Sequence, residues 1–189
     1  MKKLFPNFNP KEWTLFLDRD GVVNVRPMGD YVKKLEDFVF IENVPKAIRL
    51  LEKCFHRIVM VTNQQGIGKK LMTENDLLEI HKYMMGEIEK EGGRIDKIYF
   101  APNLASENSD MRKPGKGMAV HAQKDFPEIN FQKSLMIGDT ESDMLFAKNL
   151  NMKAISVGET KIESDAHFDD LYIFAKYFNE FCRSNNLIK

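Results

Sequence analysis

Cysteine, net charge and long apolar runs are all scarce in this sequence, and each shortage excludes a class of protein. The 189 residues include only two cysteines, Cys54 and Cys182, so we expect free thiols in a reducing compartment and no disulfide-stapled fold. The 28 basic residues are balanced by 28 acidic ones, which argues against a dedicated nucleic-acid binder. No apolar run approaches the roughly 18 residues that span a bilayer, and the N-terminus carries no signal-peptide stretch. We therefore expect a cytoplasmic protein that acts without nucleic-acid or membrane partners.

Apolar residues are nevertheless abundant enough to fill a core. Hydrophobic residues make up 43% of the chain, and no internal repeat, low-complexity tract or Pro/Gly/Ser linker divides it. A chain of this length and composition favours one hydrophobic core. We therefore expect residues 1–189 to form a single domain.

Short apolar runs alternate along the chain with longer segments of helical spacing. Nearly continuous apolar runs predict strands that are buried on both faces, at residues 14–17, 57–61, 97–100, 134–137 and 154–157. Spacing and capping signals predict helices that start near residues 43, 73, 117 and 140. A last helix is predicted from the aromatic stripe of Phe168, Leu171, Phe174, Phe178 and Phe181. This alternation predicts an α/β fold, a Rossmann-like parallel sheet with helices on both faces.

Acidic residues follow two of the predicted strands, where ligands bind in such sheets. Asp18 and Asp20 come directly after the first strand, with Gly21 allowing a sharp turn, and Asp139 follows the fourth. A single aspartate there could be only a turn or cap residue. Three carboxylates at one edge repel each other unless a cation lies between them, and hard oxygen ligands suit Mg²⁺. The sequence therefore predicts a magnesium site at this edge.

Three further polar residues are candidates for the same edge. Thr62 ends the second strand, so its hydroxyl can face the crevice, although β-branched residues are common at strand ends. Lys113 lies in a basic loop before a predicted helix, where it could balance the acids and a bound phosphate. Asp143 follows Thr140 by three residues and is either a helix cap or a residue that supports the metal site, and the two roles are compatible.

Four segments in this order resemble the motifs of the haloacid-dehalogenase-superfamily phosphatases. They are residues 18–22 (Asp-Arg-Asp-Gly-Val), 61–64 (Val-Thr-Asn-Gln), 112–114 (Arg-Lys-Pro) and 137–143, with Ile-Gly-Asp and a later Asp. Within the superfamily, the chain resembles the branch of heptose-bisphosphate and histidinol-phosphate phosphatases. The signals for that branch are Asn24, residues 62–67 and residues 112–118, and the resemblance covers roughly residues 13–158.

The resemblance implies a phosphomonoester hydrolase that works through an aspartyl-phosphate. Asp18 would attack phosphorus, and Asp20 would protonate the leaving alkoxide and then activate water, so that Asp20 must be protonated when the substrate arrives. Mg²⁺ would be held by the Asp18 carboxylate, the Asp20 carbonyl and Asp139. Thr62 and Lys113 would bind the phosphate oxygens.

Relatives often carry a cap domain after the first or second motif, but here both intervals are largely used by the sheet and its helices. The resemblance therefore implies a nearly capless enzyme, a monomer by default, that takes a small phosphorylated substrate. Arg26 and Tyr31 in the loop after the first motif, together with Arg112, are candidates for contacts with a second part of the substrate. Asn63 would steady the phosphate through its backbone or amide.

Many relatives hold zinc in the loop between the second and fourth motifs, and this chain lacks the ligands. The matching positions hold Ala101, Asn103, Ser109 and Met111. None of these side chains supplies a thiolate or imidazole, so no zinc is expected. We expect the loop to be ordered by packing around Pro102 and Leu104, or to be mobile.

These motifs define the chemistry at the phosphate group of the substrate, but they say less about the alcohol to which the phosphate is attached. We favour D-glycero-D-manno-heptose 1,7-bisphosphate, because the cations of Arg26, Arg112 and Lys113 suit a doubly phosphorylated sugar. Histidinol phosphate is the first alternative. A polynucleotide 3′-phosphatase, similar around residues 62–68, and a phospho-accepting receiver module are further alternatives. Receiver modules place their acceptor aspartate after the third strand, which ends here in Phe-Ala-Pro.

Overall fold

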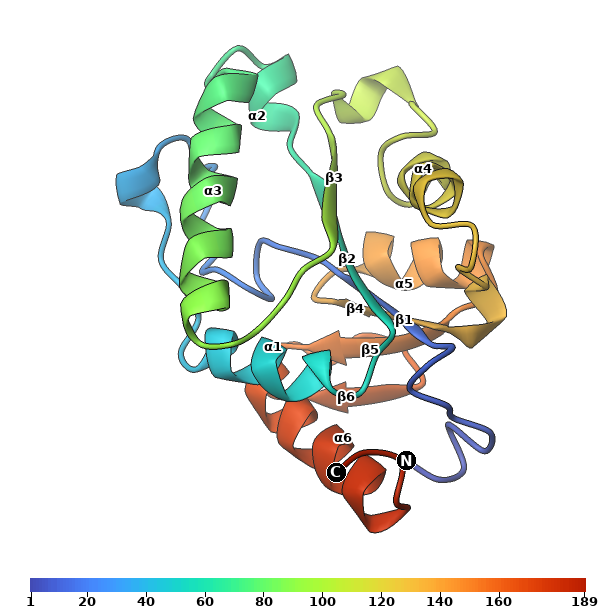
Figure 1. The fold of residues 1–189 in the computed structure, drawn as a ribbon. Coiled ribbons are helices and arrows are strands. Elements are labelled where there is room, and N and C mark those ends of the chain that lie inside the picture. Colours follow the sequence, from blue (N-terminus) through green and yellow to red (C-terminus); the bar gives the residue numbers. More distant parts are fainter.

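The computed structural model describes residues 1–189 and contains one sheet of six parallel strands, in the order β3-β2-β1-β4-β5-β6 (Figure 1). The strands are β1 Thr14–Leu17, β2 Arg57–Asn63, β3 Lys97–Ala101, β4 Ser134–Gly138, β5 Lys153–Val157 and β6 Ala166–Phe168. The predicted parallel sheet is confirmed, and all five predicted strands are present. Strand β2 also includes Thr62 and Asn63, which brings both side chains to its carboxyl end.

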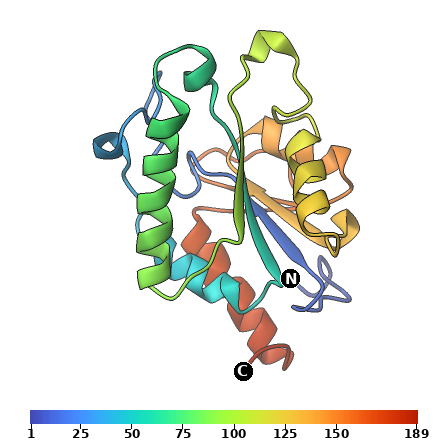
Figure 2. The same ribbon diagram turned by 45° about the horizontal axis from the view of Figure 1, so that its top comes forward.

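Helices cover both faces of the sheet, as predicted. They are α1 Val44–Glu52, α2 Gln65–Gly68, α3 Glu74–Lys90, α4 Gly117–Asp125, α5 Glu141–Asn149 and α6 Leu171–Ser184. One core cluster joins the sheet to α1, α3 and α6, and a second joins it to α4 and α5. In Figure 2 the green helix α3 and the yellow helix α4 lie on opposite sides of the strands. No helix is both long enough and apolar enough to cross a membrane.

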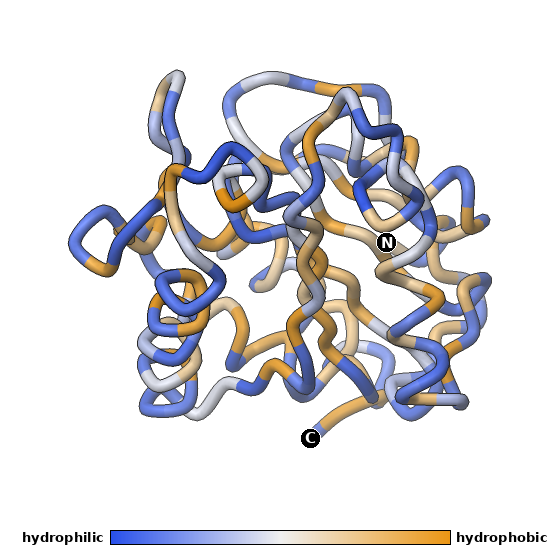
Figure 3. The backbone as a smooth tube through the Cα atoms, turned by 90° about the horizontal axis from the view of Figure 1, so that it is seen from above, coloured by the Kyte–Doolittle hydropathy of each residue, from blue (hydrophilic) through white to orange (hydrophobic).

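Side chains alternate between these two cores along each central strand. In β1, Leu15 and Leu17 belong to the core under α1, α3 and α6, whereas Phe16 belongs to the core under α4 and α5. All three side chains are fully buried. Figure 3 shows the hydrophobic chain segments in the middle of the molecule and hydrophilic segments in the surrounding loops. The continuous apolar runs of the sequence therefore reflect burial on two faces.

The order of the strands places the first and fourth motifs side by side. The chain runs from β1 outward to β2 and β3, then returns past β1 to form β4 and β5. Leu17 of β1 pairs with Ile137 of β4, so the residues after these two strands emerge next to each other. Ligands bind at such a reversal of strand order, outside the carboxyl ends of the strands. Only loops and the short 3₁₀ helix Leu35–Asp37 separate β1 from α1, which fits the predicted near absence of a cap.

Strand β6 and the short helix α2 were missed by the sequence prediction. Strand β6 has only three half-buried residues, so no apolar run marks it. Phe168, which was predicted to belong to the last helix, lies in this strand, and that prediction is wrong. Helix α6 begins later because the Asp170 side chain accepts a hydrogen bond from the Ile173 amide, at 2.6 Å, and caps the helix. The one-turn helix α2 directly follows β2 and was also unpredicted.

The aromatic face of α6 generates a stability prediction. The fully buried Phe178 ring has its centroid 5.1 Å from that of Phe5, 5.1 Å from Phe55 and 5.3 Å from Phe174. We expect Phe178→Ala to lower the free energy of unfolding by about 3–5 kcal/mol, since it leaves a cavity among these rings. The control is Tyr177→Ala, one residue earlier and 61% exposed, which should change it by less than about 1 kcal/mol. Urea unfolding measures both values, and equal losses would contradict this account of the core.

Candidate active site

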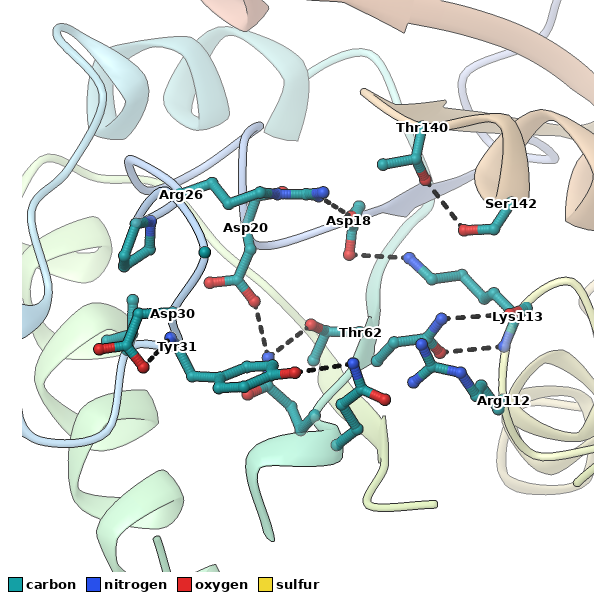
Figure 4. Close-up of a pocket in the computed structure, with 16 residues that line it drawn as sticks. Asp18, Asp20, Arg26, Asp30, Tyr31, Thr62, Arg112, Lys113, Thr140 and Ser142 are labelled. Carbon is teal, nitrogen blue, oxygen red and sulfur yellow. Dashed lines mark hydrogen bonds and ion pairs between the residues drawn. The ribbon is translucent and has the colours of Figure 1, made fainter. Parts of the chain in front are cut away.

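A cavity of about 440 Å³ lies over the carboxyl ends of β1 and β2 (Figure 4). Only two of its 16 lining residues are hydrophobic. The lining contains eight residues that the sequence predicted for the site: Asp18, Asp20, Arg26, Tyr31, Thr62, Asn63, Arg112 and Lys113. The two remaining predicted residues, Asp139 and Asp143, lie beside it, each with a carboxylate oxygen within 4.8 Å of one from Asp18. The structure therefore brings all ten predicted residues to one place.

Two glycines allow the acidic residues to approach so closely. Gly21 has a positive φ of 88°, and a Cβ atom on it would lie 1.9 Å from Oδ2 of Asp139. A Cβ atom on Gly138 would lie 2.2 Å from the Cβ atom of Asp143. Any larger residue at either position would push an acidic side chain away. The Gly-Asp and Asp-Gly pairs of the motifs are thus required by the geometry of the acid cluster.

Lys113 is the buried counter-ion of this cluster. Its ammonium nitrogen lies 2.7 Å from Oδ1 of Asp18, 2.6 Å from Oδ1 of Asp143 and 2.8 Å from the carbonyl oxygen of Val61. Burial alone would lower the pKa of Lys113, but Asp143 and Asp18 raise it above its ordinary value, so the group stays charged. The ammonium group, with its three N–H donors, thus lies against three protein oxygens. The primary role of Lys113 is therefore to neutralise the acids, and phosphate binding requires it to share one of these donors.

Asn63 positions Lys113. The Asn63 amide nitrogen donates to the backbone carbonyl of Lys113 at 3.1 Å, and the Asn63 amide oxygen accepts from the backbone N–H of Lys113 at 2.9 Å. These two bonds attach the loop that carries the lysine to the end of β2. The side-chain amide, which the resemblance offered as a phosphate contact, is occupied at both ends by this task.

Asp20 is held in a strongly polar environment. Its carboxylate accepts from Arg19 Nη2 at 2.9 and 3.0 Å, from Asn24 Nδ2 at 3.0 Å and from Gln64 Nε2 at 2.8 Å. Burial alone would raise the pKa of Asp20, but the Arg19 charge and these hydrogen bonds lower it below its ordinary value. The carboxylate is therefore ionised in this conformation, and protonation of Asp20 when the substrate arrives requires these contacts to change.

Besides Asn24, three residues that support Asp20 were given no role from the sequence. Arg19 is completely buried, and its Nη1 atom lies 3.2 Å from Nε2 of His81. Burial, aided by Arg19, lowers the pKa of His81 to about 3, so the ring is a neutral acceptor for the guanidinium. Gln64 donates to both Asp20 and the Thr62 hydroxyl, each at 2.8 Å, and so connects the two side chains. Arg19 and Gln64 stand inside the motifs, but His81 reaches the site from α3 without any sequence signal.

The acid cluster has the features of a cation site. Burial raises the pKa of Asp18 to about 7 and that of Asp139 to about 6. The three predicted ligand atoms surround the Nη2 nitrogen of Arg26, which is 2.7 Å from the Asp20 carbonyl oxygen, 2.8 Å from Asp139 Oδ1 and 3.9 Å from Asp18 Oδ2. Three oxygens that converge on one cationic nitrogen fit a bound metal cation, and oxygen ligands fit Mg²⁺.

Both carboxylate oxygens of Asp143 lie against other groups of the protein. Its Oδ1 atom pairs with Lys113, and its Oδ2 atom accepts from the backbone N–H and the hydroxyl of Thr140, at 3.1 and 2.5 Å. These contacts to Thr140 form the predicted capping box at the start of α5. Asp143 therefore combines the two roles that the sequence left open, as a helix cap and as a support of the site through Lys113.

The three predicted substrate contacts differ in their freedom to bind a ligand. The Arg26 guanidinium is bonded to the acid cluster. The Tyr31 hydroxyl accepts from Gln65 Nε2 at 2.8 Å. Arg112 makes only a long contact, 3.4 Å, with the Asn103 carbonyl oxygen. Arg112 thus offers the least engaged positive charge at the cavity.

The loop 101–111, which lacks zinc ligands, is held by packing and local hydrogen bonds. This is the first of the two possibilities that the sequence left open for the loop. The Pro102 carbonyl oxygen accepts from the Gly68 N–H at 3.2 Å, and a Cβ atom on Gly68 would lie 3.3 Å from Leu104. Asn103 Nδ2 donates to Glu107 Oε2 at 2.8 Å within the same loop. The loop is therefore attached to α2.

The site has an acidic pair after the first strand, a threonine at the end of the second, a lysine from the loop between β3 and α4, and a third acid after the fourth strand. These features define a class of protein, the haloacid-dehalogenase-superfamily phosphatases. Comparison with known families agrees. Residues 14–168 match the family described as polynucleotide kinase 3 phosphatase, and the chain belongs to this family within that superfamily.

Known relatives are named as heptose phosphatases. A D-glycero-alpha-D-manno-heptose-1,7-bisphosphate 7-phosphatase of Campylobacter jejuni is 36% identical over 173 residues, which cover 90% of this chain and 98% of the relative. The protein of the same name from Mycobacterium bovis is 33% identical over 171 residues and covers 87% and 90%. The crystal structure of a D,D-heptose 1,7-bisphosphate phosphatase from B. bronchiseptica, complexed with magnesium and phosphate, has a TM-score of 0.81, 24% identity and coverage of 89% and 98%. That structure supports the fold.

The first prediction from the site concerns Asp18. We expect Asp18→Asn to reduce kcat by roughly 10³-fold or more, since the amide keeps the shape but is not a nucleophile. The control is Glu141→Gln, which removes an exposed acid near the same edge and should retain turnover. Circular dichroism should show both variants folded. Turnover of Asp18→Asn within tenfold of the parent enzyme would contradict the role of Asp18.

Proposed function

We propose that this chain hydrolyses a phosphate ester of D-glycero-D-manno-heptose 1,7-bisphosphate through an aspartyl-phosphate on Asp18. The observation that carries the proposal is the placement of Asp18, whose carboxylate is held by Lys113 at the floor of a hydrophilic cavity. The names of the relatives, at 33% and 36% identity, support the substrate. We further propose that the protein is a cytoplasmic monomer and that it acts without nucleic-acid or membrane partners.

The first chemical step depends on the charge of Asp18. Lys113 lies 2.7 Å from Oδ1 of Asp18 and screens the carboxylate, one oxygen of which would attack phosphorus in line with the leaving oxygen. A Mg²⁺ ion held by Asp18, the Asp20 carbonyl and Asp139 would supply positive charge that keeps Asp18 ionised and screens the phosphate. The Thr62 hydroxyl oxygen accepts a hydrogen bond from Gln64. Its O–H group therefore remains available to donate a hydrogen bond to a phosphate oxygen.

The second role, general acid and then general base, belongs to Asp20. In the resting contacts, the Arg19 guanidinium and two amides stabilise its carboxylate. The proposed role requires Asp20 to turn toward the leaving oxygen, and loss of its contacts with Arg19 would raise its pKa. The same movement therefore delivers the carboxyl group and makes it easier to protonate. Asp20 then accepts a proton from the water that hydrolyses the aspartyl-phosphate.

The charge of the cavity supports a bisphosphate over the alternatives. Arg26 and Arg112 add two positive charges to a cavity that has only two hydrophobic lining residues. A second phosphate would be attracted to these groups, whereas the ammonium of histidinol phosphate would be repelled. The balanced charge of the chain offers little for a polynucleotide.

A kinetic panel tests the substrate. The panel comprises both anomers of heptose 1,7-bisphosphate, histidinol phosphate, a simple sugar monophosphate and a 3′-phosphorylated oligonucleotide. We expect one heptose bisphosphate anomer to have a kcat/KM at least about tenfold above every other compound, a difference of about 1.4 kcal/mol. A higher kcat/KM for histidinol phosphate or the oligonucleotide would replace the proposed substrate while retaining the phosphatase mechanism.

The enzyme is further proposed to need magnesium and no zinc. In the loop 101–111 the only ionisable side chains are Glu107 and Asp110, and Glu107 accepts from Asn103. We expect elemental analysis of protein purified without added metal to find no stoichiometric zinc. Chelation should abolish turnover, and Mg²⁺ alone should restore it. One tightly held zinc per chain, lost on chelation together with thermal stability, would contradict this prediction.

A further inference from the structure

Arg26 stands where its guanidinium and a metal ion compete for the same oxygens. Its Nη2 atom is 2.7 Å from the Asp20 carbonyl oxygen and 2.8 Å from Asp139 Oδ1, and Asp18 Oδ2 is 3.9 Å away. Figure 4 shows the side chain extending across the cavity toward Asp18. These oxygens come from the ends of two adjacent strands, β1 and β4. The Nη2 nitrogen of Arg26 thus lies among the three oxygens that the sequence analysis assigned to the metal ion.

Simultaneous occupation is sterically impossible. Mg²⁺ binds oxygen at about 2.0–2.1 Å, so an ion between these atoms would overlap a nitrogen that already lies within hydrogen-bonding distance of two of them. The guanidinium and the ion also carry charge of the same sign. Binding of one therefore requires departure of the other.

The Arg26 side chain is able to depart. It is 44% exposed, whereas the side chains of Asp18 and Lys113 are 6% and 2% exposed. All its polar contacts are made through Nη2 to the acid site, so no other bond holds the guanidinium there. The residue lies in the loop between β1 and α1 and lines the cavity. A rotation of this long side chain suffices to move its charge from the acids into the cavity.

We propose that Arg26 is a tethered cation that occupies the metal site of the resting enzyme and is released into the substrate cavity when Mg²⁺ binds. In the metal-free state, Arg26 screens the acids from each other and covers the nucleophile. After metal binding, the displaced guanidinium joins Arg112 and attracts the anionic part of the substrate. Metal binding is thereby coupled to anion binding, in the order metal first. The inference rests on the magnesium site of the proposed function.

Calorimetric titration with Mg²⁺ tests the competition without any measurement of activity. We expect Arg26→Gln to lower the Kd for Mg²⁺ about tenfold, as for a site that is open in only about a tenth of the parent molecules. Arg112→Gln is the matched control, because it removes the same charge from the same cavity without contact to the acids. Its Kd should change less than about twofold.

An unchanged Kd for Mg²⁺ in Arg26→Gln would overturn the competition. An equal decrease of the Kd in both variants would also overturn it, because it would show a general effect of charge. Absence of Mg²⁺ binding in all three proteins would contradict the magnesium site of the proposed function itself.

Titration with inorganic phosphate tests the coupling. In the parent enzyme, saturating Mg²⁺ should strengthen phosphate binding several-fold more than it does in Arg26→Gln, because only the parent gains a released guanidinium. The same enhancement in both proteins would overturn the release of Arg26 into the cavity, whatever the result of the metal titration.

Discussion

A buried ammonium group holds the site together. Lys113 bonds to Asp18 after β1, to the carbonyl oxygen of Val61 in β2 and to Asp143 in α5. Charges out of water are stable only when they are paired and hydrogen-bonded, and removal of one partner of such a group typically costs 3–5 kcal/mol. Without the lysine, two buried carboxylates would face each other unscreened. The positions of the nucleophile and of helix α5 therefore both depend on this contact.

The fold supplies the lysine with its partners through the order of its strands. Adjacent parallel strands β1 and β4 bring Asp18 and Asp139 to the same edge, and Gly21 and Gly138 leave room for the acids. The other cation in contact with these acids, Arg26, comes from a loop and is exposed. The acid cluster of Asp18, Asp139 and Asp143 is thus contacted by one buried positive charge and one exposed positive charge.

Much of this arrangement could be predicted from the sequence, for definite physical reasons. Strands buried on both faces leave continuous apolar runs, and residues after parallel strands must share an edge, so Asp18 and Asp139 could be placed together. Strand β6 could not be predicted because its three residues are half-buried at the edge of the sheet. The resting pair of Arg19 with Asp20 was also missed. Although the two residues are adjacent in the sequence, their contact depends on the directions of both side chains, which the sequence does not specify.

Arg26 and His81 illustrate the same limit. The loop position of Arg26 predicted a substrate contact, and only the folded structure places its guanidinium on the acids. His81 stands in the middle of α3 on a face that reads as ordinary core, yet it contacts Arg19. In both cases the type of residue was visible in the sequence, and its partner was not.

The most direct test of the account is the identity of the residue that carries the phosphoryl group during catalysis. The first turnover on the preferred substrate would be stopped with acid, and the digested protein would be examined by mass spectrometry. The account predicts a phosphoryl group on Asp18, formed as fast as the alcohol product. A phosphoryl group on any other residue, or a first turnover that releases phosphate while Asp18 is never phosphorylated, would contradict it.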